Sequence, residues 1–309
     1  MNMIFLFFIT IVITNTVCSQ SDTNSLPSFQ TKKEWKLVWQ DEFNYKGLPD
    51  SSIWDYEDGF IRNNEKQFYT VKRKENVFVQ DGFLTITCRK ETYVNPHYEE
   101  LKKKNVGWAY PSKYSDLPDS LIPSWIKNKY APYAQYTSGS ITTKNKAFWK
   151  YGRFEVRAKL PKGSGIWPAL WMLGIDKNRT GWPKCGEIDI MEFIGKTPET
   201  IYGTVHYADT LTKIHLSKGG KVKVLNLHDD FHIYSTEWDS ANIIISVDDK
   251  AYLKFPLSNA GLSEENAFRQ PFYFLINLAL GGNWPGPIDD SMLPQKFVID
   301  YVRVYQQND

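Results

Sequence analysis

Hydrophobic and polar residues alternate along much of this chain, and this two-residue period predicts β-strands. The clearest case is the segment 153–160, where every second residue from Phe154 to Leu160 is apolar and the residues between are charged. Such alternation is typical of a strand with one buried and one solvent-facing side. Further segments rich in β-branched and aromatic residues are predicted as strands: 83–88, 201–207, 231–238, 243–247, 272–280 and 297–305.

The connections between these segments favour an all-β fold. No segment shows the long 3.6-residue apolar repeat of an amphipathic helix. The run Asp248-Asp249-Lys250 lies between two predicted strands and indicates a hairpin turn. Several short strands separated by Gly, Pro, Asn and Asp predict a β-sandwich or a β-barrel.

Composition agrees with a globular fold and excludes several classes of protein. The 309 residues are 42% hydrophobic and 23% charged, which excludes a mostly disordered chain. The net charge is only +2 and the sequence shows no strong basic patch, so no nucleic-acid partner is expected. Aromatic residues make up 15% of the chain, enough to fill a core, line a binding surface, or do both.

The N-terminal segment has the pattern of an export signal. Residues 1–19 carry no charge, and their apolar run is too short to span a bilayer. We therefore predict a signal peptide at 1–19, a polar linker at 20–30 and a secreted domain at 31–309 with no membrane span. Cys18 leaves a second possibility, a lipid anchor on the outer surface. Of the other cysteines, Cys88 and Cys185 are either two buried thiols or a pair.

The segment 95–135 does not fit the strand pattern. It contains five prolines, three consecutive lysines and many aromatic residues. A long irregular insert in a compact domain is usually functional or mobile. The aromatic content favours either a packed surface loop or a wall at one end of a binding cleft.

The most informative segment is 186–193, because it predicts three acids on one face of a strand. Glu187 and Asp189 alternate with isoleucines, but strict alternation would turn Glu192 toward the core. A buried unpaired carboxylate is costly. One extra residue near Met191, a β-bulge, would return Glu192 to the acidic face, and bulges often re-aim side chains at active sites.

Three carboxylates this close suggest acid–base chemistry. Mutual repulsion should raise at least one pKa. A retaining glycosidase needs this combination, with one carboxylate as nucleophile and a protonated one as acid, about 5–5.5 Å apart. A cation site and a structural acidic strand are the alternatives that the residues leave open.

The segment 186–193 resembles the signature of glycoside hydrolase family 16, in particular its laminarinase branch. Six other segments resemble the family in the same order; they are 39–43, 63–70, 165–172, 203–207, 277–286 and 299–305. The resemblance implies a β-jelly-roll sandwich of two antiparallel sheets with a concave cleft and no cofactor for catalysis. It also implies Glu187 as nucleophile, Glu192 as general acid/base and Asp189 as the residue that holds the nucleophile.

The resemblance also suggests a binding surface. Tryptophan rings can stack on the apolar faces of sugars. The residues expected to bind substrate are Trp167, Trp171, Trp182, Asn63, Glu65, His206 and, on weaker grounds, Arg73 and Trp284. Glu42, Gly82 and Asp300 resemble positions that hold a structural calcium ion, although ordinary hydrogen bonding would also explain the two acids.

The function expected from the sequence is endo-hydrolysis of β-1,3-glucan with retention of configuration, by a monomer. A mixed-linkage β-1,3-1,4-glucan or an algal galactan is the alternative substrate, and the insert could shift cleavage toward chain ends. A non-catalytic glucan-binding protein is a distant third possibility, because all three acids are present.

Overall fold

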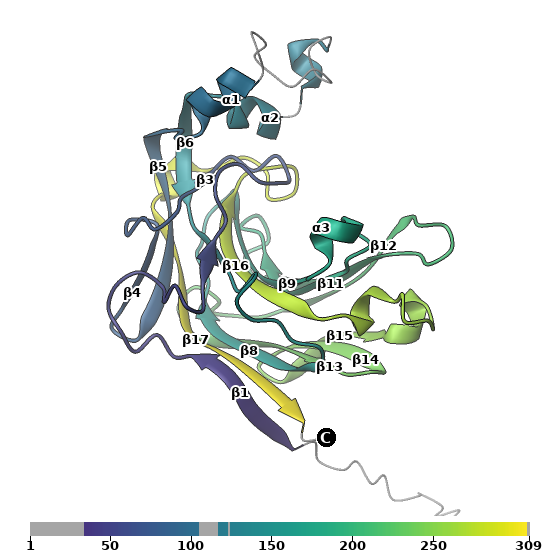
Figure 1. Cartoon of the computed structure of the whole chain (residues 1–309). Helices are drawn as coiled ribbons and strands as arrows, with labels where there is room; N and C mark the ends of the chain where they lie inside the picture. Colours follow the sequence, from purple (N-terminus) through teal and green to yellow (C-terminus); the bar gives the residue numbers. More distant parts are fainter. Residues whose placement is uncertain (1–33, 105–116, 123, 308–309) are drawn as a thin grey trace, which may run out of the picture. The chain divides into compact units, whose positions relative to one another are not determined.

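The computed structural model describes residues 34–104, 117–122 and 124–307. The predicted signal peptide, the linker and Cys18 lie outside the described residues. Two β-sheets pack face to face in the described domain (Figure 1). No helix within the described ranges combines the length and apolar character that a membrane crossing needs.

The larger sheet has ten strands. Eight form a continuous path in the order β15 (Lys250–Pro256), β14 (Asn242–Val247), β13 (His232–Trp238), β8 (Gly152–Lys159), β17 (Gln295–Gln307), β5 (Phe83–Val94), β6 (Tyr133–Ser138) and β3 (Phe68–Tyr69). The other two are β1 (Trp35–Asp41), which pairs with β17, and β4 (Val77–Gln80), which pairs with β5. All these pairs are antiparallel except β3 with β6.

The smaller sheet carries the site. Its seven strands are ordered β12 (His215–Lys223), β11 (Thr200–Ala208), β10 (Glu187–Phe193), β9 (Ile166–Gly174), β16 (Phe272–Leu280), β7 (Ser140–Thr142) and β2 (Asp55–Tyr56). The short helices are α1 (Tyr98–Lys104), α2 (Ser124–Lys129) and α3 (Lys177–Thr180). The 3-10 turns are η2 (Asp119–Leu121), η3 (Leu257–Ala260), η4 (Ala267–Arg269) and η5 (Asp290–Met292).

The seven predicted strands are present; six differ from the prediction by at most two residues at either end, and β5 continues six residues beyond it, to Val94. Strand β8 alternates buried and half-buried residues along its whole length, as its sequence predicts. Residues Asp248 and Asp249 adopt positive φ values of 47° and 61°, which form the tight turn between β14 and β15. The segment 95–135, predicted to be irregular, contains α1, α2 and the first residues of β6.

Strands β9 and β16, in the middle of the smaller sheet, are buried on both faces. On β9, Leu170 and Met172 belong to the main core between the sheets. The alternate residues Trp171 and Leu173 join a second cluster with Cys185, Tyr273 and Leu275. Because successive residues of a strand point to opposite faces, this second cluster forms the floor of the outer, concave face. All nine residues of β16 are buried, because this strand is also covered on both faces.

Candidate active site

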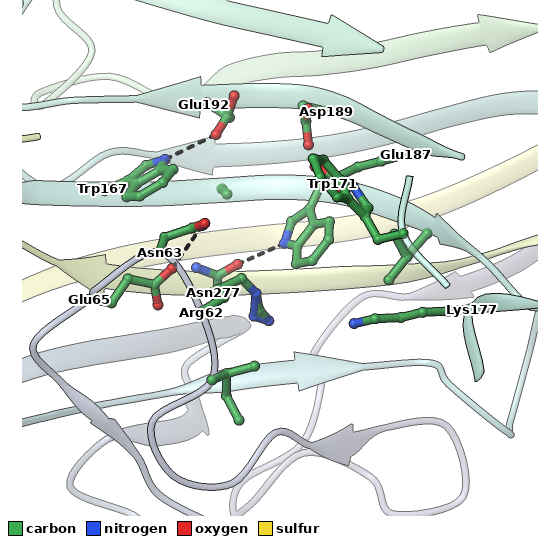
Figure 2. A pocket seen from close by; sticks show the side chains of 14 residues that line it. Arg62, Asn63, Glu65, Trp167, Trp171, Lys177, Glu187, Asp189, Glu192 and Asn277 are labelled. Carbon is green, nitrogen blue, oxygen red and sulfur yellow. Dashed lines mark hydrogen bonds between the residues drawn. The ribbon is translucent and has the colours of Figure 1, made fainter. Parts of the chain in front are cut away.

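Strand β10 contains the predicted bulge. Its pairing with β11 shifts register between Asp189 and Glu192, and its pairing with β9 shifts between Asp189 and Met191. Met191 is fully buried in the main core. Glu187, Asp189 and Glu192 therefore line one cavity, and Figure 2 shows them along the same side of the strand.

A partly buried tyrosine that was not predicted supports this bulge. The Tyr252 hydroxyl donates a 2.6 Å hydrogen bond to the carbonyl of Ile190, inside the irregular part of β10. Gly203 makes room for it, since a Cβ at that position would lie 2.9 Å from the Tyr252 ring. Tyr252 comes from β15 of the opposite sheet, so no local sequence signal connects it to the site.

Asp189 and Glu192 stand in an environment that favours their protonated forms. Asp189 is only 4% exposed, and burial, the charge of Glu187 and a hydrogen bond with Glu187 raise its pKa well above the ordinary value. Burial also raises the pKa of Glu192 well above its ordinary value, and the charges of Asp189 and Glu187 add to this effect. The pKa rise predicted from the sequence is therefore present.

Two of the predicted tryptophans contact the acids directly. The Trp167 indole N–H donates to Glu192 Oε1 at 3.1 Å, as Figure 2 shows. The Trp182 N–H donates to Glu187 Oε2 at 2.9 Å, and the Trp182 ring is 47% exposed. Each indole thus fixes one carboxylate while its ring borders the cavity.

His206 lies on the β11 side of the acids. Its Nε2 is 3.3 Å from Asp189 Oδ2, a distance that allows an ion pair. Its Nδ1 is 3.0 Å from Nε2 of His215, the first residue of β12, and the two rings stack. His215 also packs on Trp182 at a centroid distance of 4.6 Å. His215 was not predicted, because only strand pairing brings it beside His206.

The opposite wall is a chain of polar groups that are buried except for the exposed Asn63. The Trp171 N–H donates to Asn277 Oδ1 at 2.7 Å, and Asn277 Nδ2 donates to the Tyr69 hydroxyl at 3.0 Å. Tyr69 and Asn63 in turn donate to the two oxygens of Glu65, at 3.1 and 3.3 Å. The predicted residues Trp171, Asn63 and Glu65 are therefore joined in one network, with Asn277 and Tyr69 as additional members.

Two cationic side chains that were not predicted also line the cavity (Figure 2). The Arg62 guanidinium lies 4.9 Å from the centroid of the Trp171 ring and is hydrogen-bonded to Glu57. Burial opposes its charge, but Glu57 and Glu65 outweigh burial and raise its pKa. Burial lowers the pKa of Lys177, which extends from α3, and the charge of Arg62 adds to this effect.

The cavity has a volume of about 300 Å³ and crosses the strands of the concave sheet. Its lining passes from the acids of β10 to Trp171 on β9, Asn277 on β16 and the loop that contains Arg62 and Asn63. A cavity in this direction suits an extended ligand that runs perpendicular to the strands.

Three residues predicted to bind substrate, His206, Arg73 and Trp284, are not among those that line this cavity. Arg73 forms a bidentate ion pair with Glu91 of β5, at 2.7 and 2.9 Å, which satisfies its charge within the larger sheet. Trp284 packs edge-on against Trp167 at a centroid distance of 5.3 Å. The structure thus places Trp284 behind a cavity residue and Arg73 apart from the cavity.

The two acids predicted to bind calcium are both paired with arginines in this structure. Both oxygens of Glu42 accept hydrogen bonds from Arg303, at 2.7 and 2.8 Å. Asp300 is paired with Arg157. A cation would have to displace two arginines, and calcium at Glu42, Gly82 and Asp300 stays a prediction. Among the described residues, two carboxylates and one imidazole, those of Glu187, Asp189 and His206, have potential metal-ligand atoms within 4.8 Å of one another.

The two packed sheets and the carboxylate-lined cavity together define a sandwich-type glycoside hydrolase. Residues 64–303 match glycosyl hydrolases family 16, and the chain belongs to this family. The β-jelly-roll fold that the resemblance implied is thereby confirmed.

Individual relatives agree with this assignment. A β-glucanase of Rhodothermus marinus is 39% identical over 285 residues, which are 88% of this chain and 85% of the relative. The solved laminarinase of the same organism has a TM-score of 0.72 and 37% identity and covers 90% of this chain and 100% of its own. A solved structure from work on endo-acting O-glycanases that initiate mucin breakdown, from the human gut microbiota, has a TM-score of 0.75 and 40% identity, covering 89% and 91%.

Proposed function

We propose that this chain is a retaining endo-β-1,3-glucanase. The observation that carries the proposal is the bulged strand β10, which presents Glu187, Asp189 and Glu192 to one cavity. The glucanases among the relatives support the substrate: a β-glucanase, a laminarinase and a glucan endo-1,3-β-glucosidase of Cryptopygus antarcticus that is 32% identical over 93% of its length.

The environment of each acid supports a role in double displacement. Glu192, with its raised pKa, holds a proton that it donates to the glycosidic oxygen as the bond to the anomeric carbon breaks. Glu187 attacks that carbon and forms a covalent glycosyl-enzyme. Glu192, now ionised, removes a proton from water, and the water oxygen displaces Glu187 and completes hydrolysis.

Asp189 and the indole donors hold this arrangement. The hydrogen bond between Asp189 and Glu187 orients the nucleophile. The N–H of Trp182 donates a second hydrogen bond, to Glu187 Oε2. As Glu187 loses its charge in the covalent intermediate, the repulsion that raises the pKa of Glu192 decreases. The change favours ionised Glu192 at the step that needs a base.

A second candidate substrate is a galactose-containing chain such as a mucin-type O-glycan. The similarity to the O-glycanase structure, at 40% identity, favours it. A keratan-sulfate endo-1,4-β-galactosidase of Sphingobacterium multivorum is a further relative at 28% identity. Arg62 and Lys177, which were not predicted, line the cavity, and their positive charges suit a sugar that carries an anionic substituent.

A polysaccharide panel with product sizing separates the two substrates. Laminarin, lichenan, agarose, carrageenan, xyloglucan and mucin are each incubated with the enzyme, and reducing ends and product lengths are measured. We expect laminarin to yield short oligosaccharides early in the reaction, as internal cleavage requires. A product from mucin or agarose without any from laminarin would replace the leading proposal with the second.

The acids can be tested by isosteric variants. Glu187→Gln removes the nucleophile, so hydrolysis should stop while the fold is retained. Glu192→Gln removes the acid/base catalyst and should lower kcat by about 10²–10⁴-fold. Rates on laminarin and melting temperatures of both variants check this, and a Glu187→Gln enzyme as active as the parent would refute the nucleophile assignment.

We further propose export of the chain, supported by the charge-free apolar segment 1–19. Intact mass measurement of protein recovered outside the cell distinguishes free secretion from a lipid on Cys18. Full-length protein retained inside the cell would contradict export.

A further inference from the structure

A second cavity continues the direction of the cleft. It also has a volume of about 300 Å³ and is bordered by Asp58, Phe68, His97 and Glu100 among others. Ile61 lines both cavities, so the two are adjacent. The segment 58–61 follows directly from β2, the last strand of the concave sheet. The second cavity therefore lies where a chain that crosses β10, β9 and β16 would leave the sheet.

The insert supplies one wall of this cavity, and a buried residue holds the wall in place. Asn95 is 4% exposed, and its side-chain amide donates to the carbonyls of Lys129 and Ala131 at 3.0 and 2.9 Å. Its Oδ1 accepts from the backbone N–H of His97 at 3.0 Å. Asn95 thus ties the start of the insert to its end, and α1 begins one residue after His97.

His97 and Asp58 form a preorganised polar pair at the cavity. The His97 ring stacks on the buried ring of Phe68, at a centroid distance of 6.0 Å and an angle of 19°. Its Nε2 lies 2.8 Å from Asp58 Oδ2. Both side chains stay about 40% exposed, His97 at 40% and Asp58 at 41%. An exposed ring edge or face beside a carboxylate offers both the packing and the hydrogen bonds that a sugar ring uses.

We infer that the insert builds a distal subsite at Asp58 and His97 for a further sugar unit of the polysaccharide chain. This inference rests on the proposed function, because the occupant is the same chain that the acids cleave. The physical basis is continuity through Ile61, together with a ring stacked on Phe68 and in contact with a carboxylate. The subsite contributes only when the substrate is long enough to reach it.

The experiment compares substrates of different length. Initial rates are measured on short β-1,3-gluco-oligosaccharides and on polymeric laminarin, and the ratio of kcat/KM for polymer over short substrate is taken for each enzyme. His97→Ala should lower this ratio about three- to tenfold, through KM, because stacking and a hydrogen bond are lost. His97→Phe keeps the ring on Phe68 and should lower it less. Asp58→Asn, which keeps the volume of the side chain, should also lower it.

Lys103→Ala is the matched control, since Lys103 is an exposed residue of α1 that does not line the cavity. Its ratio should equal that of the parent. An unchanged ratio in both His97→Ala and Asp58→Asn would overturn the subsite, and so would an equal loss on substrates of every length. If the parent cleaves no β-1,3-glucan, the proposed function fails first, and the same ratio is then measured on the polymer that the parent does cleave.

Discussion

At the scale of single residues, the active acids work against the stability of the fold. Burial and mutual charge raise the pKa of both Asp189 and Glu192. A carboxyl whose pKa is higher in the folded state than in the unfolded state favours folding while it is protonated. That contribution is lost as the pH rises from the unfolded pKa toward the folded one. The raised pKa values therefore lower the free energy of unfolding near neutral pH, and they also let Glu192 keep its proton there.

Replacing Glu192 by glutamine should remove this cost. The amide oxygen can still accept the Trp167 hydrogen bond, and it never ionises. We expect Glu192→Gln to melt at the same temperature as the parent at pH 4 and at least about 2 °C above it at pH 7. Thermal denaturation from pH 4 to 8 checks this. The exposed Glu264→Gln is the control, and a Glu192→Gln gap that is constant with pH would contradict the explanation.

The charge of Asp189 should also affect how the activity depends on pH. The charge of Asp189 is one of the causes that raise the pKa of Glu192. Asp189→Asn should lower the pKa of Glu192 and move the alkaline limb of kcat/KM to lower pH. Rates on laminarin between pH 4 and 9 test this shift, and a limb that stays in place would show that Asp189 is not charged when Glu192 acts.

The strand pattern predicted the three acids, and the family resemblance predicted Asn63, Glu65, His206 and the three tryptophans. Alternation within 186–193 was enough to predict the acids and the bulge, because a glutamate at Glu192 would otherwise be buried. Asn277, His215 and Tyr252 were missed, since each reaches the site through tertiary packing rather than local spacing.

At the scale of elements, the site depends on an irregular strand, and Tyr252 is the contact that holds it. Tyr252→Phe would leave the carbonyl of Ile190 without this hydrogen-bond donor. We expect a loss of about 1–3 kcal/mol in the free energy of unfolding and a fall in kcat, because the positions of Asp189 and Glu192 would loosen. Denaturant unfolding and laminarin kinetics measure the two effects.

A second tyrosine provides the matched control for this prediction. Tyr234 on β13 is fully buried, and its hydroxyl has no hydrogen-bond partner within the described residues. Tyr234→Phe should therefore leave stability and kcat close to those of the parent. If the two substitutions have equal effects, the Tyr252 hydroxyl does not support the bulge.

Long strands were predicted from the sequence, but the shortest strands and helices were not. The alternating segment 153–160 and the almost continuously apolar segment 272–280 were recognised, since burial on one or both faces leaves a clear pattern. The two-residue strands β2 and β3 are too short for a period to show. The helices α1 and α2 were also missed, because six or seven residues amid prolines carry no helical repeat.

At the scale of the whole molecule, the two cysteines belong to different apolar clusters. Cys88 lies in the main core between the sheets, and Cys185 lies in the cluster under the cleft. Both are free and buried. The sequence left two possibilities, a disulfide or two buried thiols, and the structure shows two buried thiols. Burial raises the pKa of Cys88 to about 12 and that of Cys185 to about 11, so neither thiolate is populated at neutral pH.

A fold held by its two sheets rather than by a disulfide should be insensitive to reductant. We expect dithiothreitol to leave the melting temperature and the laminarin rate unchanged. Because the thiolate is the reactive form, a thiol reagent at pH 7 should label neither cysteine in the native protein and both after denaturation. A Cys18→Ser background keeps that residue out of the count. A mass two units lower in the non-reduced protein, or a drop in melting temperature with reductant, would show instead that the thiols pair and that the packing of the two clusters must differ.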